Sequence, residues 1–188
     1  MSHEIFDLRI RNFPGYARGM IAGYLLALTV GYGYAIGNIT LVVGMTPEKV
    51  ALHYAGSQPG GSSNTSGSTT GEQELNLDEV VEAPQAVAPS FKNLVGEGHF
   101  HLFGMSSFFF GLCLIGLFLD ISSRWKTLLL TAPFALIVLD NLSFMATRFG
   151  GPSFSYLTVA VGSLMGVNFL ALWYLIVKEL LLAGRRSQ

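Results

Sequence analysis

Four long apolar segments constrain this chain more than any other feature of its sequence. They cover residues 19–44, 96–119, 127–147 and 153–180. About 20 apolar residues in a helix cross the roughly 30 Å of hydrocarbon in a bilayer. In that hydrocarbon only helices and closed barrels satisfy their own backbone hydrogen bonds. The sequence therefore predicts an all-α integral membrane protein built as a four-helix bundle.

The composition excludes several classes of protein. Charged residues make up 12% of the chain, whereas a soluble domain has about 25%. A formal net charge of −1 offers no basic surface for nucleic acid. The single cysteine, Cys113, rules out an internal disulfide and any cysteine-based zinc or iron–sulfur site. The chain has no nucleophile elbow, phosphate loop or His-Glu-x-x-His motif, so we expect a non-catalytic or electron-transfer subunit rather than a stand-alone enzyme.

The distribution of lysine and arginine predicts the orientation of the bundle. Basic residues are concentrated in segments 1–18, 120–126 and 181–188. The positive-inside rule places these segments, and with them both termini, in the cytoplasm. The loop 45–95 and the turn 148–152 then face outward. We expect the protein in a bacterial cytoplasmic (inner) membrane, with the long loop in the periplasm or the exterior.

The long extracytoplasmic loop, residues 45–95, is expected to be only partly ordered. It opens with Thr-Pro-Glu from residue 46, which supplies an N-cap, a proline at the first helical position and an acid in the first turn. This start predicts a short helix at 47–55. From 57 to 71 glycine, serine and threonine predominate, which predicts a flexible linker that cannot bury enough surface to fold.

Glycines and a proline predict how the spans pack. Small residues four apart let two helix backbones approach closely. Glycines have this spacing at Gly19 and Gly23, Gly33 and Gly37, and Gly162 and Gly166. We therefore expect close helix packing in a compact bundle. Pro133 in the third span predicts a kink or a loosened backbone hydrogen bond.

Three of the four histidines are predicted at the outer end of the bundle. His53 lies in the short loop helix, and His99 and His101 open the second span. Ionisable groups so close to hydrocarbon are costly and mark a functional site by default. Residues two apart on a helix point about 200° apart, so His99 and His101 share a site only if the helix begins at or after His99. Glu97, His101 and Met105 share one face, whose donor types suit haem or a soft metal.

Polar residues of other spans are predicted at the depth of His101. With a rise of about 1.5 Å per residue, Asp140 and Asn141 of the third span and Asn38 of the first span fall near the same level. Arg148 follows the third span and is a candidate partner for a haem propionate. This convergence predicts a site near the outer membrane face.

The first functional hypothesis is an electron-transfer subunit with a b-type haem. Two axial imidazoles would come from His53, His99 and His101, and Met105 and Arg148 would complete the cofactor site. The protein would belong to an electron-transfer or respiratory-type complex and work with other membrane subunits or a periplasmic electron carrier. In shape it resembles the four-helix membrane cytochromes b. Those proteins usually carry ligands on two or more spans, whereas here the first, third and fourth spans contain no histidine.

Three alternatives stay open from the sequence. Copper or zinc is a candidate for His53, His99 and His101 together with Glu97 or Asp140, in a protein for metal handling. A quinone is a candidate ligand for His101 and Asp140 without any metal. An accessory subunit of a larger membrane complex, surrounded by lipid and carrying no cofactor, is the third. In that case Asp140 is bonded within the bundle.

Overall fold

The computed structural model describes residues 9–57 and 86–184, and in these ranges it is entirely helical. Four of its helical segments are long and apolar enough to cross a membrane: Gly15–Val43, Phe91–Gly116, Ser123–Phe149 and Pro152–Ala183. The prediction of an all-α fold with four membrane-spanning helices is confirmed.

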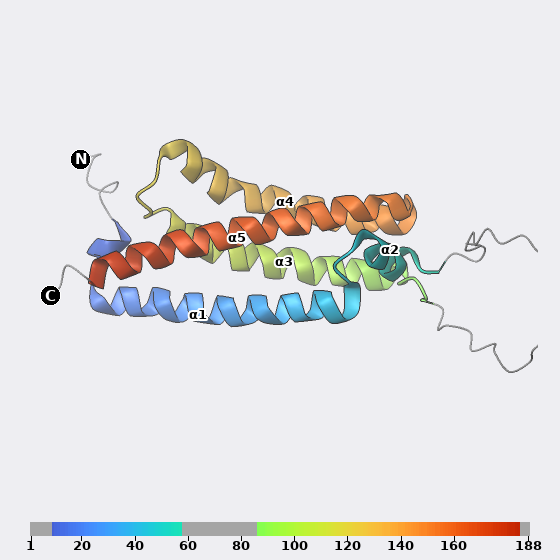
Figure 1. Cartoon of the computed structure of the whole chain (residues 1–188), viewed down its shortest axis with the longest axis horizontal. Helices are drawn as coiled ribbons and strands as arrows, with labels where there is room; N and C mark the ends of the chain where they lie inside the picture. The colour runs from blue at the N-terminus through green and yellow to red at the C-terminus, as the bar shows by residue number, and fades with distance from the viewer. Residues whose placement is uncertain (1–8, 58–85, 185–188) are drawn as a thin grey trace, which may run out of the picture.

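The four spans run alternately up and down one bundle (Figure 1). The elements in chain order are η2 (Ile10–Asn12), α1 (Gly15–Asn38), the π-helical turn η3 (Ile39–Val43), α2 (Pro47–Ala55), α3 (Phe91–Gly116), α4 (Ser123–Phe149), η4 (Pro152–Phe154) and α5 (Ser155–Gly184). The short helix α2 lies at one end of the bundle, which we call the α2 end. The first described residues and the end of α5 lie at the opposite end.

The spanning helices extend beyond the apolar segments of the sequence. α3 begins at Phe91 rather than at residue 96, because the Ser90 hydroxyl accepts a hydrogen bond from the Asn93 amide at 3.2 Å and caps the helix. α5 continues to Gly184 rather than ending at residue 180. An apolar run marks only the part of a helix that crosses hydrocarbon. Polar residues continue the same helix into the headgroup region and water.

The two described ends of the long loop lie beside each other. α2 occupies Pro47–Ala55, where the sequence predicts a helix, and the Thr46 hydroxyl caps it. Ser57 and Ala86 exchange two hydrogen bonds, with N–O distances of 2.9 and 3.0 Å. The predicted flexible linker at 57–71 lies outside the described residues, except for its first residue, Ser57.

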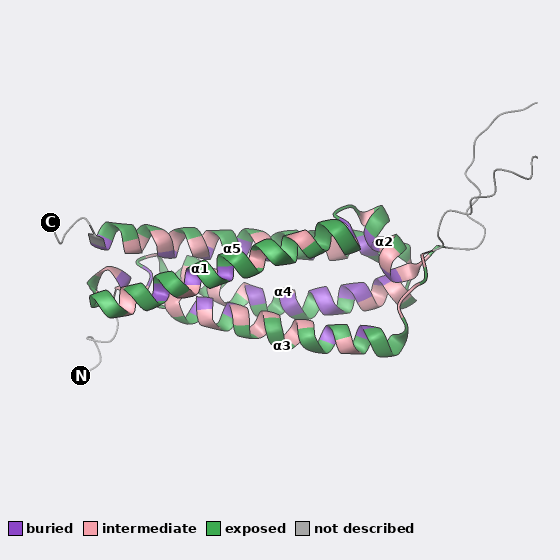
Figure 2. Cartoon of the chain, turned by 90° about the horizontal axis from the view of Figure 1, so that it is seen from below, coloured by how far each residue is buried: buried purple, intermediate pink, exposed green. Residues whose placement is uncertain are grey.

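The hydrophobic core lies mainly between α3, α4 and α5. Its most buried members include Phe109 and Leu112 of α3, Ile137 of α4, and Leu172 and Ile176 of α5. α1 contributes Ile21, Leu25 and Leu28 and leaves most of its surface exposed (Figure 2). α1 is therefore the span with the least packing inside this chain.

The glycine pairs of α1 do not pack against the bundle. A methyl group added at Gly19, Gly23, Gly33 or Gly37 would meet no atom within 4 Å. The expectation that these pairs hold helices together is wrong for the described chain, because α1 packs through its larger apolar residues instead. The close approach between α1 and α5 instead involves a glycine of α5: the Tyr32 hydroxyl of α1 lies over Gly166.

Gly166→Ala is expected to lower the free energy of unfolding by about 1 kcal/mol. The new Cβ would lie 2.6 Å from the Tyr32 oxygen, and the Tyr32 ring is packed at 4.4 Å from the Phe169 ring. Gly162→Ala is the matched control, since Gly162 has open space and gains the same helix propensity. Denaturant unfolding in detergent micelles compares the two variants. Equal stability of both would contradict the close approach.

Pro133 leaves one carbonyl of α4 without its usual helical donor. Proline has no backbone N–H, so the carbonyl four residues earlier, that of Leu129, loses its helical hydrogen bond. The Asn168 side chain of α5 donates Nδ2 to this Leu129 oxygen at 3.3 Å. A polar residue in the middle of α5 is thereby explained, because unpaired carbonyls are costly in hydrocarbon.

Candidate functional site

His101 of α3 and Asp140 of α4 face each other near the α2 end. Nε2 of His101 lies 3.0 Å from Oδ2 of Asp140, and the two side chains are 34% and 12% exposed. Nε2 nevertheless has no partner of hydrogen-bond geometry among the described residues. The contact is therefore electrostatic, and it becomes an ion pair when the imidazole carries a proton. Ionisable groups that face each other between spanning helices are candidates for function.

Asn141 adds a second incompletely paired polar group beside this pair. Its Nδ2 donates to the Ile137 carbonyl of its own helix at 3.0 Å. Its buried Oδ1 has no partner in the described chain, and it lies close to α3 at Gly98, where an added Cβ would be 3.0 Å away. Buried polar atoms are normally satisfied by protein or water. The α3–α4 interface thus holds one buried amide oxygen without a partner, next to an imidazole and a carboxylate in electrostatic contact.

Tyr54 of α2 covers this end of the α3–α4 interface. Its side chain is buried, and its ring stacks on Phe144 of α4 with the centroids 5.4 Å apart. Its hydroxyl donates to Oε1 of Glu97 on α3 at 3.3 Å. Burial raises the pKa of Tyr54 above its ordinary value, and the carboxylates of Glu97 and Asp140 raise it further. Tyr54 is therefore a neutral phenol at physiological pH.

The other two described histidines lie in different surroundings. The His53 ring meets the Tyr54 ring edge-on at 4.7 Å. His99 is exposed and lies against Phe103 at 4.9 Å between ring centroids. His99 and His101 thus have separate neighbours, as expected for residues two apart on a helix. Within residues 9–57 and 86–184, no three His, Cys, Asp or Glu side chains are grouped to hold a metal ion.

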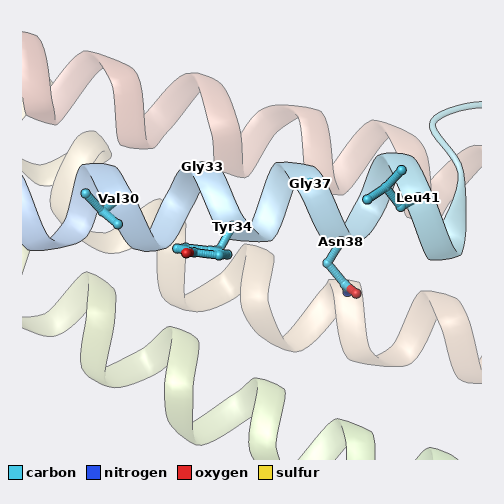
Figure 3. A pocket seen from close by; sticks show the side chains of 6 residues that line it. All are labelled: Val30, Gly33, Tyr34, Gly37, Asn38 and Leu41. Carbon is cyan, nitrogen blue, oxygen red and sulfur yellow. The ribbon is translucent and has the colours of Figure 1, made fainter.

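The remaining predicted site residues have contacts of their own. Arg148 donates Nε to the Pro89 carbonyl at 3.1 Å and lies over the Phe149 ring, so it ties the chain before α3 to the end of α4. Met105 packs against the main core. Asn38 is exposed on α1 and lines an open groove of about 450 Å³ (Figure 3).

Tyr54 is the site residue that sequence reasoning missed. It reads as one apolar position of a short loop helix, since Val50 and Tyr54 are four residues apart and share a face. That spacing indicates that α2 has one face to bury. It does not show that the docking surface is α3 and α4 beside the His101–Asp140 pair.

The fold and its four apolar helices define an integral membrane protein. Residues 44–187 match the family Aq_1264_TM, described as a transmembrane helical domain. Because the match covers most of the chain, the protein belongs to this family. No curated protein and no solved structure matches the chain.

Proposed function

We propose that this protein is a small membrane subunit of an electron-transfer or respiratory-type complex, and that His101 and Asp140 bind the headgroup of a quinone. The observation that carries the proposal is the 3.0 Å contact between these two ionisable side chains on neighbouring spans. Lipid-soluble ligands reach such a position from the bilayer, and ionisable groups there are seldom retained without a role.

The chemistry of a quinone suits this pair. A quinone offers two carbonyl oxygens that accept hydrogen bonds, and it takes up two protons with two electrons on reduction. A protonated His101 donates to a carbonyl oxygen, and the Asp140 carboxylate accepts a proton from a quinol hydroxyl. The buried Oδ1 of Asn141 beside the pair supports the proposal, because it has no hydrogen-bond partner among the described residues and buried polar atoms are normally paired.

A haem or a metal ion suits the described geometry less well. A haem held by two of the histidines, or a copper or zinc ion held by all three, needs separate rings to meet at one point. In the described chain His53 lies against Tyr54, His99 against Phe103 and His101 against Asp140. We therefore rank the quinone first, because it needs only the pair that is already together.

The surroundings of the protein belong to the same proposal. Lipid contacts the exposed apolar helix faces, and other membrane subunits or a periplasmic electron carrier exchange electrons with the complex. The proposed location is a bacterial cytoplasmic membrane, and the distribution of lysine and arginine supports an orientation with the α2 end facing outward.

A second candidate function uses the same contact differently. In an accessory subunit without a cofactor, His101 and Asp140 tie α3 to α4, as Arg148 ties the chain before α3 to α4. Both candidates predict a destabilised bundle when the pair is broken. Only the first predicts quinone binding.

The deciding experiment is equilibrium binding of short-chain ubiquinone and menaquinone analogues to the purified protein in lipid nanodiscs. His101→Gln and Asp140→Asn are expected to weaken binding by about tenfold or more, the cost of one lost hydrogen bond to a charged group. His99→Gln is the matched control, since it changes the same residue type on an exposed face of the same helix.

The outcomes separate the candidates. Weakened binding in both pair variants and unchanged binding in His99→Gln supports the quinone site. No binding by the native protein favours the accessory subunit. A reduced-minus-oxidised optical spectrum of the same sample tests the haem, because a sharp b-type α band would restore that hypothesis.

A further inference from the structure

α1 is the span that the rest of the chain covers least. In the most apolar stretch of α1, 6% of the residues are buried, against 22%, 28% and 33% in the other three spans. Tyr34 and Leu41 are 79% and 87% exposed, and Figure 2 shows α1 exposed along most of its length. An apolar helix face costs nothing in lipid, so exposure by itself predicts no partner. The shape of this face and its one amide side chain are more informative.

An open groove of about 450 Å³ lies on the outward face of α1 (Figure 3). A Cβ added at Gly33 or Gly37 would meet no atom within 4 Å, so the two glycines leave a depression in the helix surface. Larger side chains form a ridge beside this depression. The residues that line the groove thus form two rows of four-residue spacing, the ridge of Val30, Tyr34 and Asn38 and the glycine row of Gly33, Gly37 and Leu41.

The two rows of this groove face complement each other. Rows of residues four apart are the ridges through which two helices interdigitate, and glycines four apart allow close crossings of about −40° in bilayers. A partner has to offer a ridge for the glycine row and a depression for the ridge. A second copy of α1 offers both when a two-fold axis relates the copies, because the same two rows then meet in exchanged roles.

The membrane permits this arrangement. Copies of one membrane protein insert with the same orientation, so a two-fold axis along the membrane normal brings two α1 helices together in parallel. Each position near the axis then meets itself. Residues 19–44 contain no charged side chain, so no like charges oppose each other across the contact.

Asn38 adds polar complementarity to the groove face. Its exposed amide projects from α1 at the groove (Figure 3). An amide both donates and accepts hydrogen bonds, so Asn38 can pair with the same residue of a second copy. Polar side chains form interhelical hydrogen bonds in membranes, and a single asparagine fixes the register of paired parallel helices.

We propose that the groove face of α1 binds the same face of a second copy and forms a parallel two-fold dimer in the membrane. Gly33 and Gly37 let the two backbones approach, and the Asn38 amides bond across the axis. The inference goes beyond the proposed function, since the groove face belongs to α1 and the His101–Asp140 pair lies between α3 and α4.

Energy transfer between donor-labelled and acceptor-labelled copies of the full chain in phosphatidylcholine vesicles tests the dimer as the protein is diluted in lipid. Gly33→Leu is expected to weaken dimerisation by about tenfold or more, because the added side chain fills the depression that receives the ridge. Asn38→Leu is expected to weaken it by about three- to tenfold, the contribution of one interhelical hydrogen bond. Gly162→Leu is the matched control, since Gly162 of α5 is equally open.

The proposal is supported if dilution separates the native dimer, both α1 variants weaken it and Gly162→Leu does not. A native protein that is monomeric at every dilution overturns it and leaves the groove face to another membrane subunit or to lipid. A dimer that both α1 variants leave unchanged overturns it as well, because the copies then meet through another face. Circular dichroism of each variant shows whether a loss of dimer reflects a loss of helix.

Discussion

Asp140→Ala is expected to lower the free energy of unfolding by about 1–3 kcal/mol, because it leaves His101 without its counter-charge between two spanning helices. The lower part of this range is expected, since the His101 side chain is 34% exposed and partly screened by solvent. His101→Ala is expected to cost a similar amount by isolating the buried carboxylate. Reversible unfolding in mixed detergent micelles measures both variants.

The double variant His101→Leu/Asp140→Leu makes this prediction specific to the pair. It removes both ionisable groups and keeps apolar volume, so most of the lost stability should return. His99→Leu, on an exposed face of α3, is expected to stay within about 0.5 kcal/mol of the native protein. If the two single costs simply add in the double variant, the pair is not coupled.

Asn168→Leu is expected to destabilise the bundle by about 1–3 kcal/mol, because it removes the donor for the Leu129 carbonyl. That carbonyl has no helical partner while residue 133 is proline. In a Pro133→Ala background the restored backbone N–H can bond Leu129, and the cost of Asn168→Leu should fall below about 0.5 kcal/mol. A four-point unfolding cycle measures this difference.

Thr131→Val is the control for this cycle. The Thr131 hydroxyl donates to the Thr127 carbonyl of its own helix at 2.8 Å, and that carbonyl keeps its ordinary helical bond. Its loss should therefore cost the same with or without Pro133. An equal cost of Asn168→Leu in both backgrounds would show that Asn168 does not compensate for the proline.

The depth of the candidate-site residues in the bundle was predictable from the sequence, whereas the direction of their side chains was not. Counting about 1.5 Å per residue places His101 and Asp140 at one level, and the structure has them 3.0 Å apart. The same count places Asn38 at that level, yet Asn38 is exposed on α1. Depth depends only on the position of a residue in its span. The direction of a side chain depends on how each helix is rotated about its axis, and packing sets that rotation.

The sequence by itself determined the four spans and the helical fold, because hydrocarbon forces every backbone group into hydrogen bonds within its own segment. Thr46 and Pro47 likewise signal the start of α2, since capping acts within a few residues. Only the tertiary structure decided three contacts: the α1 glycines face outward, Asn168 donates a hydrogen bond to the Leu129 carbonyl, and Tyr54 packs on Phe144 and bonds Glu97. These contacts join residues far apart in the chain, and no local pattern encodes which helix face meets which.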